Sequence, residues 1–204
     1  MIGAEPIVHV VDDDASVRTA LARLLRAAGY TVSAWDSARA FLQAGAGRAR
    51  GCVVLDLRMA EMDGLELQQA LTQQNPGLPI VFLTGHGDLA TGVQAMKAGA
   101  ADFLTKPVER QTLLAAVVQA LARDEANQAA QEELRILQQC HATLTPRERE
   151  VFDRVAAGLL NKQIALEIGA AERTVKLHRA RVMEKMQART LADLVRAADR
   201  LKLP

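Results

Sequence analysis

Acidic and polar side chains stand where several apolar runs of this sequence end. Asp56 closes the apolar run 52–55, whose composition is typical of a strand buried on both faces, and an unpaired carboxylate is costly in such a place. Similar positions after other apolar runs carry further polar groups, namely Asp12, Asp13, Asp14, Thr84 and Lys106. If the runs are parallel strands of one sheet, these groups meet at the edge where such sheets bind ligands.

The residue types at this edge suit phosphoryl chemistry. Carboxylates held close together repel unless a cation neutralises them, and a few acids completed by water are ligands typical of Mg²⁺. A carboxylate can also attack a phosphoryl group and hold it as an acyl phosphate, while Lys106 and Thr84 could neutralise its oxygens. An aspartate at a strand end is often only a turn residue, but four matching strand ends argue against coincidence. We therefore predict that Asp56 is phosphorylated.

The elements that must position these groups follow an alternating pattern. Strands are predicted at 7–11, 31–35, 52–56, 79–84 and 101–105, with a helical pattern after each. Such alternation is typical of an α/β fold with a doubly wound five-stranded parallel sheet. The pattern stays helical from residue 108, thins to Ala, Gln and Glu over 124–141, and becomes compact again after residue 142. We interpret residues 124–141 as a long helical linker.

Charge is divided unevenly along the 204 residues, although the whole chain carries a net charge of only +1. Residues 1–141 have a net charge of −4 and residues 142–204 a net charge of +5, which favours a nucleic-acid partner for the C-terminal part. The two cysteines indicate no disulfide framework. Neither a signal peptide nor a membrane span is visible, so we expect a cytoplasmic protein that does not bind membranes.

The basic C-terminal part reads as four helices, at 146–157, 161–168, 172–186 and 190–202. The two middle helices, joined through Gly169, have the spacing of a helix-turn-helix. Val175, Val182 and Met186 predict a buried stripe on the third helix. The opposite arc carries Arg173, Lys176, Leu177, Ala180 and Arg181, and Asn161, Lys162 and Thr174 are placed to hold backbone phosphates. A basic helix face is often merely solvated, so this pattern alone leaves DNA binding open.

Several motifs resemble the receiver domain of two-component response regulators of the FixJ type, over residues 5–123. They are "VVDDDASVR", "VLDLRMAEMDGLEL", "IVFLTGHGD" and "MKAGAADFLTKP". The resemblance implies a CheY/flavodoxin-like sheet of strand order 2-1-3-4-5 and phosphotransfer to Asp56 from a sensor histidine kinase. It implies a Mg²⁺ site made of Asp12, Asp13, Asp56 and the backbone carbonyl of Arg58, with Asp12 acting largely through water. Lys106 matches the phosphate-pairing lysine, and Thr84 and Phe103 match the switch pair.

This sequence departs from the receiver pattern at two positions near the expected site. Ala60 stands where the family usually has proline, and Val108 where it often has phenylalanine. Neither change removes a chemical group, so we expect altered kinetics rather than loss of function. The resemblance also implies a cis peptide bond between Lys106 and Pro107, and it gives Asp14 no ligand role.

A second resemblance, to the LuxR/FixJ-type helix-turn-helix domain, covers residues 142–202 and supports a DNA-binding domain at 142–204. Its motifs are "LTPREREV", "GLLNKQIA" and "TVKLHRARVMEKM". The resemblance implies that Lys176, Leu177 and Ala180 read bases and that Lys162, Thr174 and Arg179 contact the DNA backbone. Ala171 replaces the serine that usually caps the recognition helix, and losing such a cap costs ~1 kcal/mol. In the family the last helix pairs with its counterpart on DNA.

The leading hypothesis is a phosphorylation-controlled transcription regulator, most simply an activator, that dimerises through residues 88–105 and can contact RNA polymerase. It is not expected to be an enzyme beyond slow loss of its own phosphate. A DNA-binding regulator whose receiver works without phosphate remains an alternative. An aspartate-nucleophile phosphatase needs a second acid two residues after Asp56, where Arg58 stands. A dinucleotide-binding enzyme needs a glycine-rich turn after the first strand, and the sequence "VHVVDDDAS" has none.

Overall fold

A computed structural model describes residues 5–74, 77–85 and 89–201 of the chain. Residues 86–88, where the predicted fourth helix and dimer face begin, and residues 202–204 of the predicted DNA-binding domain lie outside the described residues. The chain divides between residues 128 and 129 into two compact units, and each is described by itself.

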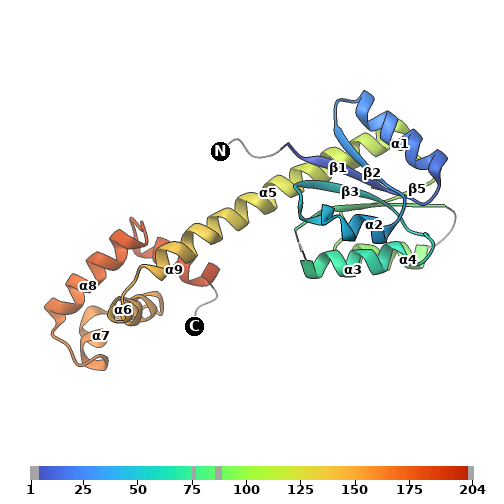
Figure 1. Cartoon of the computed structure of the whole chain (residues 1–204). Coiled ribbons are helices and arrows are strands. Elements are labelled where there is room, and N and C mark those ends of the chain that lie inside the picture. Colours follow the sequence, from blue (N-terminus) through green and yellow to red (C-terminus); the bar gives the residue numbers. More distant parts are fainter. Residues whose placement is uncertain (1–4, 75–76, 86–88, 202–204) are drawn as a thin grey trace. The chain divides into compact units, whose positions relative to one another are not determined.

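The N-terminal unit is built on a five-stranded sheet whose neighbouring strands are all parallel, in the order β2-β1-β3-β4-β5 (Figure 1). The strands are β1 (Ile7–Val11), β2 (Thr31–Trp35), β3 (Gly51–Asp56), β4 (Ile80–Thr84) and β5 (Asp102–Thr105). The helices are α1 (Ala15–Ala27), α2 (Ala38–Gln43), α3 (Gly64–Gln74), α4 (Leu89–Lys97) and α5 (Arg110–Ala142), with a short 3₁₀ helix, η1 (Ala46–Arg48), before β3. The predicted α/β fold and strand order are confirmed.

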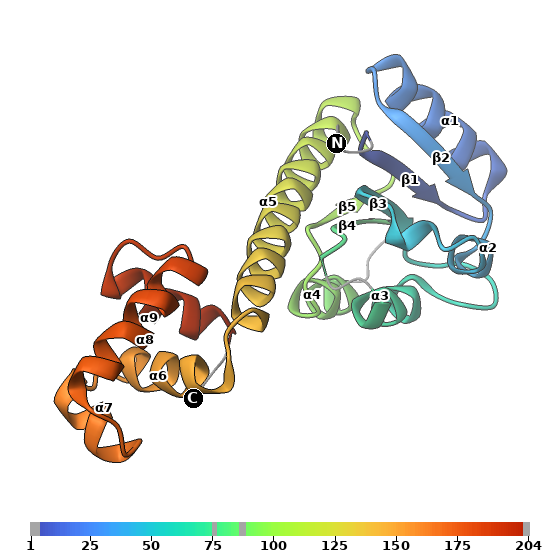
Figure 2. The ribbon, with the colours of Figure 1, turned by 60° about the vertical axis from the view of Figure 1, so that its left-hand side comes forward.

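Helices cover both faces of this sheet, with α1 and α5 on one face and α2, α3 and α4 on the other (Figure 2). The first face is packed with Leu21 and Leu25 of α1 and Leu113 of α5. On the other face, Phe41 of α2 and Leu67 of α3 lie against the sheet. All residues of β3 and β4 are buried, as expected for central parallel strands. Polar side chains at their carboxyl ends are therefore held by rigid elements.

Helix α5 is tied to the N-terminal unit by two polar contacts within the predicted linker 124–141, one to the start of β3 and one to the connection before β4. The carboxylate of Asp124 is 1% exposed and accepts a hydrogen bond of 3.1 Å from the Gly51 amide, with the Arg50 guanidinium 3.7 Å away. One turn later, the Asn127 side-chain amide donates to the Gly77 carbonyl at 2.7 Å. The first residues of the predicted linker therefore contact the receiver sheet.

The C-terminal unit contains α6 (Pro146–Ala156), α7 (Asn161–Glu167), α8 (Glu172–Lys185) and α9 (Leu191–Leu201), together with the end of α5. Its core includes the predicted stripe of Val175, Val182 and Met186, which is confirmed as buried. Leu137 and Cys140 of α5 pack against the same core. The last residues of the predicted linker therefore belong to the packing of the C-terminal unit.

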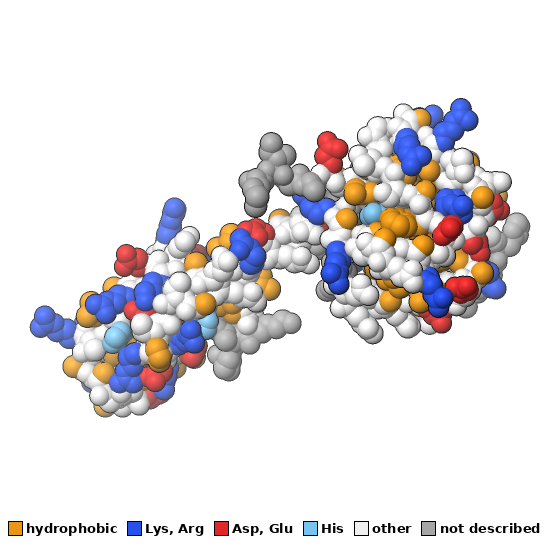
Figure 3. All heavy atoms as spheres, in the orientation of Figure 1, with side chains coloured by type: hydrophobic (Ala, Val, Ile, Leu, Met, Phe, Trp, Pro, Cys, Tyr) orange, Lys and Arg blue, Asp and Glu red, His pale blue; other side chains and the backbone are white. Residues whose placement is uncertain are grey.

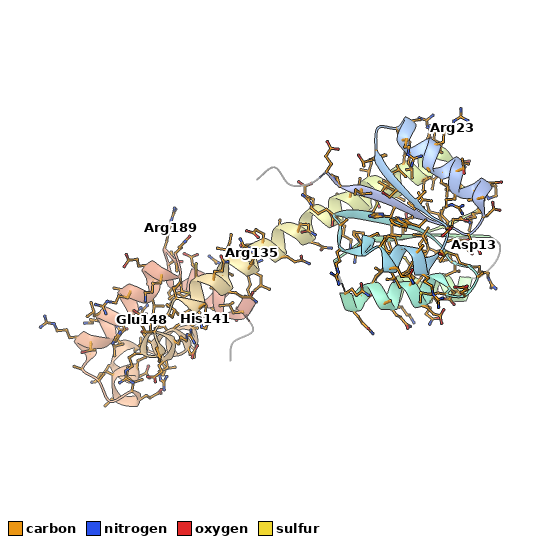
Figure 4. The ribbon with its side chains drawn as sticks, viewed as in Figure 1. Asp13, Arg23, Arg135, His141, Glu148 and Arg189 are labelled. Atoms are coloured by element: carbon orange, nitrogen blue, oxygen red, sulfur yellow. The ribbon has the colours of Figure 1, made fainter. Side chains whose placement is uncertain are left out.

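The start of α6 is fixed by polar groups whose spacing is typical of a capping box. The Thr145 hydroxyl accepts a hydrogen bond from the Glu148 amide, and the Glu148 carboxylate accepts one from the Thr145 amide, which together form the capping box. The Lys185 ammonium, from the end of α8, lies 2.6 Å from the same carboxylate. His141 lies edge-on to the Phe152 ring nearby, and Figure 4 labels His141 and Glu148 in this unit.

The last helix divides its apolar residues between the core and the surface. Leu194 is completely buried and Leu201 packs partly against the core, whereas Leu191 is 43% exposed. Leu191 is therefore available to a partner helix. No helix among the described residues has the length and apolar character needed to cross a membrane.

Candidate functional site: an acidic cluster and a basic helix

Three carboxylates meet at the carboxyl edge of the sheet, as predicted. Asp12 and Asp13 follow β1 and Asp56 ends β3, and each places one oxygen within 4.8 Å of the others. Asp12 and Asp56 are buried, whereas Asp13 is exposed and is labelled at the edge of the receiver in Figure 4. The Asp14 carboxylate instead accepts hydrogen bonds from the Ser16 and Val17 amides and caps α1.

Lys106 joins two of these acids. Its ammonium lies 2.7 Å from Asp12 Oδ2 and 3.1 Å from Asp56 Oδ2. The Lys106 amide also donates to the Thr84 carbonyl at 2.6 Å, which fixes the residue to the end of β4. The Lys106–Pro107 peptide bond is cis, as the resemblance implied. A positive charge is therefore placed beside the predicted phosphoacceptor.

Burial and charge act on these groups in opposite directions. Burial raises the pKa of Asp56, the nearby Asp12 charge raises it further, and Lys106 and a hydrogen bond from the Arg58 backbone partly offset these effects. Burial lowers the pKa of Lys106, but hydrogen bonds and charge from Asp12 and Asp56 outweigh burial and leave that pKa raised. Lys106 therefore keeps its proton and its positive charge beside Asp12 and Asp56.

The oxygen-only donor set fits a hard divalent cation. Three carboxylates against one ammonium leave a net negative cluster, and the exposed Asp13 leaves an open side where water could complete the coordination of Mg²⁺. Asp12, Asp13 and Asp56 are thus brought together as predicted. The backbone of Arg58 hydrogen-bonds to Asp56, while a metal-ligand role for its carbonyl remains a prediction.

The two predicted switch residues lie on neighbouring strands. Thr84 ends β4 and is 2% exposed, next to the site, whereas Phe103 lies on β5 and is half-buried. The Phe103 ring rests against Gly92 of α4 so closely that a Cβ added there would lie 2.9 Å from it. Thr84 is therefore buried at the end of the strand next to β3, and the Phe103 ring lies against α4. Their coupled movement remains a prediction.

The predicted DNA-contacting residues lie on α7 and α8 of the C-terminal unit. Most of them are exposed, namely Lys162, Arg173, Thr174, Lys176, Leu177, Ala180 and Arg181, while Asn161 and Arg179 are half-buried. Figure 3 shows Lys and Arg side chains standing out from this unit. The Arg179 guanidinium donates to the Asn161 side-chain oxygen at 3.1 Å, so these two residues hold each other. Base and phosphate contacts for individual residues stay predictions.

Some residues at these sites were missed by the sequence analysis. The Arg18 guanidinium donates to the Asp12 carbonyl at 2.7 Å, and the Ala60 amide donates to the Asp13 carboxylate at 3.0 Å. Glu172 lies 3.1 Å from Lys176 on the predicted DNA face, a pair that the i, i+4 spacing could have indicated. Backbone donors such as the Ala60 amide leave no signal in side-chain type.

Comparisons with known proteins agree with this geometry. Residues 8–118 match the family model of the response regulator receiver domain, and residues 142–198 match that of the bacterial regulatory proteins of the luxR family. Nodulation protein W of Bradyrhizobium diazoefficiens is 48% identical over 195 residues, which cover 96% of this chain and 86% of that protein. The transcriptional regulatory protein FixJ of the same organism is 44% identical over 95% of this chain and 94% of that protein.

Solved structures support the same assignment. The response regulator StyR matches with a TM-score of 0.80 and 48% sequence identity, over 96% of this chain and 99% of that chain. Full-length FixJ from B. japonicum matches with a TM-score of 0.59 and 43% identity, over 97% of each chain. The chain therefore belongs to the two-component response regulators of the FixJ/LuxR type, with a receiver domain followed by a LuxR-type helix-turn-helix domain.

Proposed function

We propose that Asp56 accepts a phosphoryl group from a sensor histidine kinase in a Mg²⁺-dependent reaction, and that the phosphate controls DNA binding and transcription, most simply as an activator. The observation that carries this proposal is the contact of Asp56 with the Lys106 ammonium at 3.1 Å, within the cluster completed by Asp12 and Asp13. Residues 5–123 act as the receiver, 124–141 as the connecting helix and 142–204 as the DNA-binding domain.

In the transfer step, an oxygen of Asp56 attacks the phosphorus atom of phosphohistidine. The P–O bond forms as the P–N bond breaks, and the electron pair of that bond returns to the imidazole nitrogen of the kinase. The Lys106 ammonium already lies beside Asp56 and can pair with a phosphoryl oxygen, while the Thr84 hydroxyl can donate to another. When bound by Asp12, Asp13 and Asp56, Mg²⁺ supplies positive charge that offsets the charge of the phosphoryl oxygens.

The phosphate would be read out through the α4–β5 face. An apolar hollow of about 340 Å³ on this face is lined by Gly92, Val93, Met96, Lys97 and Phe103. Val93 is 49% exposed and Met96 is 45% exposed, so the face can bury apolar area against a second receiver. Movement of Thr84 toward the phosphate would let the Phe103 ring reorient and change this face. The phosphorylated protein would then form a homodimer.

On DNA, α8 would enter the major groove with Lys176, Leu177 and Ala180 toward the bases. Arg173 and Arg181 lie on the same exposed arc, and Asn161, Lys162, Thr174 and Arg179 would hold the backbone. The exposed Leu191 of α9 would pair the two DNA-binding domains on adjacent half-sites. A cytoplasmic location follows from these partners, and contact with RNA polymerase would follow promoter binding.

Two alternatives make different predictions. A receiver that works without phosphate would leave DNA binding unchanged when Asp56 is replaced. A phosphatase acting on free substrates would need an acid at position 58, where the exposed Arg58 stands. Hydrolysis would therefore be limited to slow loss of the aspartyl phosphate of this chain.

The deciding experiment measures the affinity of the full-length protein for a DNA site selected from a random pool. Titrations are made with Mg²⁺, with and without beryllofluoride, on the native protein and on Asp56→Asn. Beryllofluoride should tighten DNA binding of the native protein and leave Asp56→Asn unchanged. Equal affinity in all four titrations would reject control of DNA binding by phosphate.

A further inference from the structure

The loop between β3 and α3, residues 57–63, is held closely against the sheet. The Leu57 amide donates to the Leu83 carbonyl, and the Gly64 amide donates back to the Leu57 carbonyl, both at 2.9 Å. Position 64 has no room for a side chain, because an added Cβ would lie 2.6 Å from the Asp56 carbonyl oxygen. The loop therefore has fixed ends directly after the phosphoacceptor.

The middle of this loop makes a tight turn. The Met62 amide donates to the Ala60 carbonyl at 2.8 Å across Glu61, whose φ of 68° lies in the left-handed region. A hydrogen bond over three residues with a positive central φ is the rare form of the γ-turn and carries backbone strain. Such a turn leaves little freedom to the Ala60 backbone.

The Ala60 amide is directed at the acidic cluster. It donates to Asp13 Oδ2 at 3.0 Å, across 47 positions of sequence. Asp12 and Asp56 are buried and share the Lys106 ammonium, whereas Asp13 is exposed, and an exposed carboxylate can rotate between several positions. A fixed donor reduces this freedom while the other lone pairs of the carboxylate remain available.

We propose that Ala60 is a positioning residue, whose backbone amide orients Asp13 for Mg²⁺ and so links the metal site to the phosphoacceptor loop. The inference rests on the proposed function for its biological meaning. Proline, usual at this position in receivers, has no amide hydrogen and cannot make the contact. This chain would thus hold its exposed metal ligand through a donor that the usual residue lacks.

The test is calorimetric titration of the metal-free full-length protein with MgCl₂. Ala60→Pro removes the donor and should weaken Mg²⁺ binding about three- to tenfold, the loss typical of one hydrogen bond to a charged group near solvent. Ala60→Ser keeps the backbone amide. It should bind Mg²⁺ within about twofold of the native protein, because the contact with Asp13 needs only that backbone donor. Thermal unfolding in EDTA checks that each variant is folded.

A double-mutant cycle separates positioning from general damage to the loop. In the Asp13→Asn background, Ala60→Pro should cause no further loss of Mg²⁺ affinity, because the group it orients is no longer a charged ligand. Native affinity in Ala60→Pro, or an equal loss in the Asp13→Asn background, would overturn the proposal. Uptake of phosphate from acetyl phosphate is measured separately, so a chain that shows the Mg²⁺ pattern but takes no phosphate would refute the proposed function alone.

Discussion

The acidic site of the receiver and the predicted DNA-binding face of α8 differ in how the fold holds their side chains. In the receiver, Asp12, Asp56 and Thr84 are all less than 10% exposed, and strand ends and Lys106 hold them in place. On α8, Lys176 and its neighbours are exposed, and Lys176 pairs with the exposed Glu172 at 3.1 Å. The first site is held together by the fold before any ligand binds, whereas the second consists of exposed side chains on a helix surface.

This difference determines how each region should respond to substitution. A buried, preorganised site has few replaceable members, so a single change should remove its chemistry almost completely. An exposed basic face spreads its binding free energy over many contacts, so each change should cause a graded loss.

Asp56→Asn should abolish covalent phosphorylation, with at least a ~100-fold loss of phosphate uptake, because an amide oxygen is a poor nucleophile compared with a carboxylate. Uptake is measured with a labelled phosphodonor, as the amount of acid-labile label that the protein retains. Asp36→Asn, an exposed acid after β2, is the matched control and should behave as the native protein. Substantial acid-labile label on Asp56→Asn would place the phosphoacceptor on another residue.

Lys176→Ala should weaken binding to the selected DNA site by ~1–3 kcal/mol, about 5- to 150-fold, and relax preference at one base pair. Lys162→Ala is the contrasting change, because a backbone contact should lower affinity for all sequences and reduce the salt dependence by about one ion. Both are measured by fluorescence anisotropy at several salt concentrations. If Lys176→Ala lost affinity equally for every sequence, its role in reading bases would be refuted.

Asp124→Ala should destabilise the receiver by ~1–3 kcal/mol, because the Gly51 amide and Arg50 lose a buried partner. Urea unfolding followed by fluorescence reports on the receiver, since Trp35 of β2 is the single tryptophan of the chain. Glu125→Ala changes an exposed acid on the next position and should cost less than ~0.5 kcal/mol. Equal effects of the two changes would mean that Asp124 does not fasten α5 to the sheet.

Much of the architecture was predictable because its causes are local in sequence. Residue type and spacing indicate the buried strands that end in Asp56 or Thr84, and also the capping box at Thr145. The role of Asp124 could not be predicted, because an acid among Ala, Gln and Glu resembles a solvated linker residue. Only the fold brings its carboxylate to the Gly51 amide. The hydrogen bond from Ala60 to Asp13 could not be predicted for another reason. Its donor is a backbone amide, which every residue except proline has.

Glu148→Gln should destabilise the C-terminal unit by about 1–2 kcal/mol at pH 7. Hydrogen bonds from Lys185 and the Thr145 amide lower the pKa of Glu148 to about 2 from an ordinary value of 4.5. The stabilisation from its charge is therefore complete above pH 4.5 and lost as pH falls toward 2. Hydrogen exchange of α6 amides should show the native protein and variant converging over this window.

Glu150→Gln is the matched control for this pH dependence. Glu150 lies on the same helix and pairs with Arg147 at 2.6 Å, but both side chains are more than 40% exposed. An exposed pair contributes little, so this change should leave α6 exchange nearly unaltered. If Glu150→Gln matched Glu148→Gln, burial would not be the property that separates strong from weak polar contacts in this chain.

Ala171→Ser should produce the smallest effect and the only gain. Ala171 precedes α8 in an extended conformation, with φ −71° and ψ 145°, and its side chain caps no amide. A serine oxygen there can accept from an amide of the first turn and stabilise the start of the helix by ~1 kcal/mol. Hydrogen exchange of the first α8 amides measures this gain, and Ala171→Val, which adds bulk without an acceptor, should not reproduce it.

The same substitution also tests whether disorder in the first turn of α8 limits the affinity of the protein for DNA. If part of the DNA-binding free energy is spent on ordering the first turn of α8, a capped helix should bind the selected site up to about fivefold more tightly. Tighter binding by Ala171→Ser but not by Ala171→Val would show that DNA completes this face. A stabilised helix with unchanged affinity would show that α8 is already ordered without DNA, and that the two functional regions of the protein are more alike than their exposure suggests.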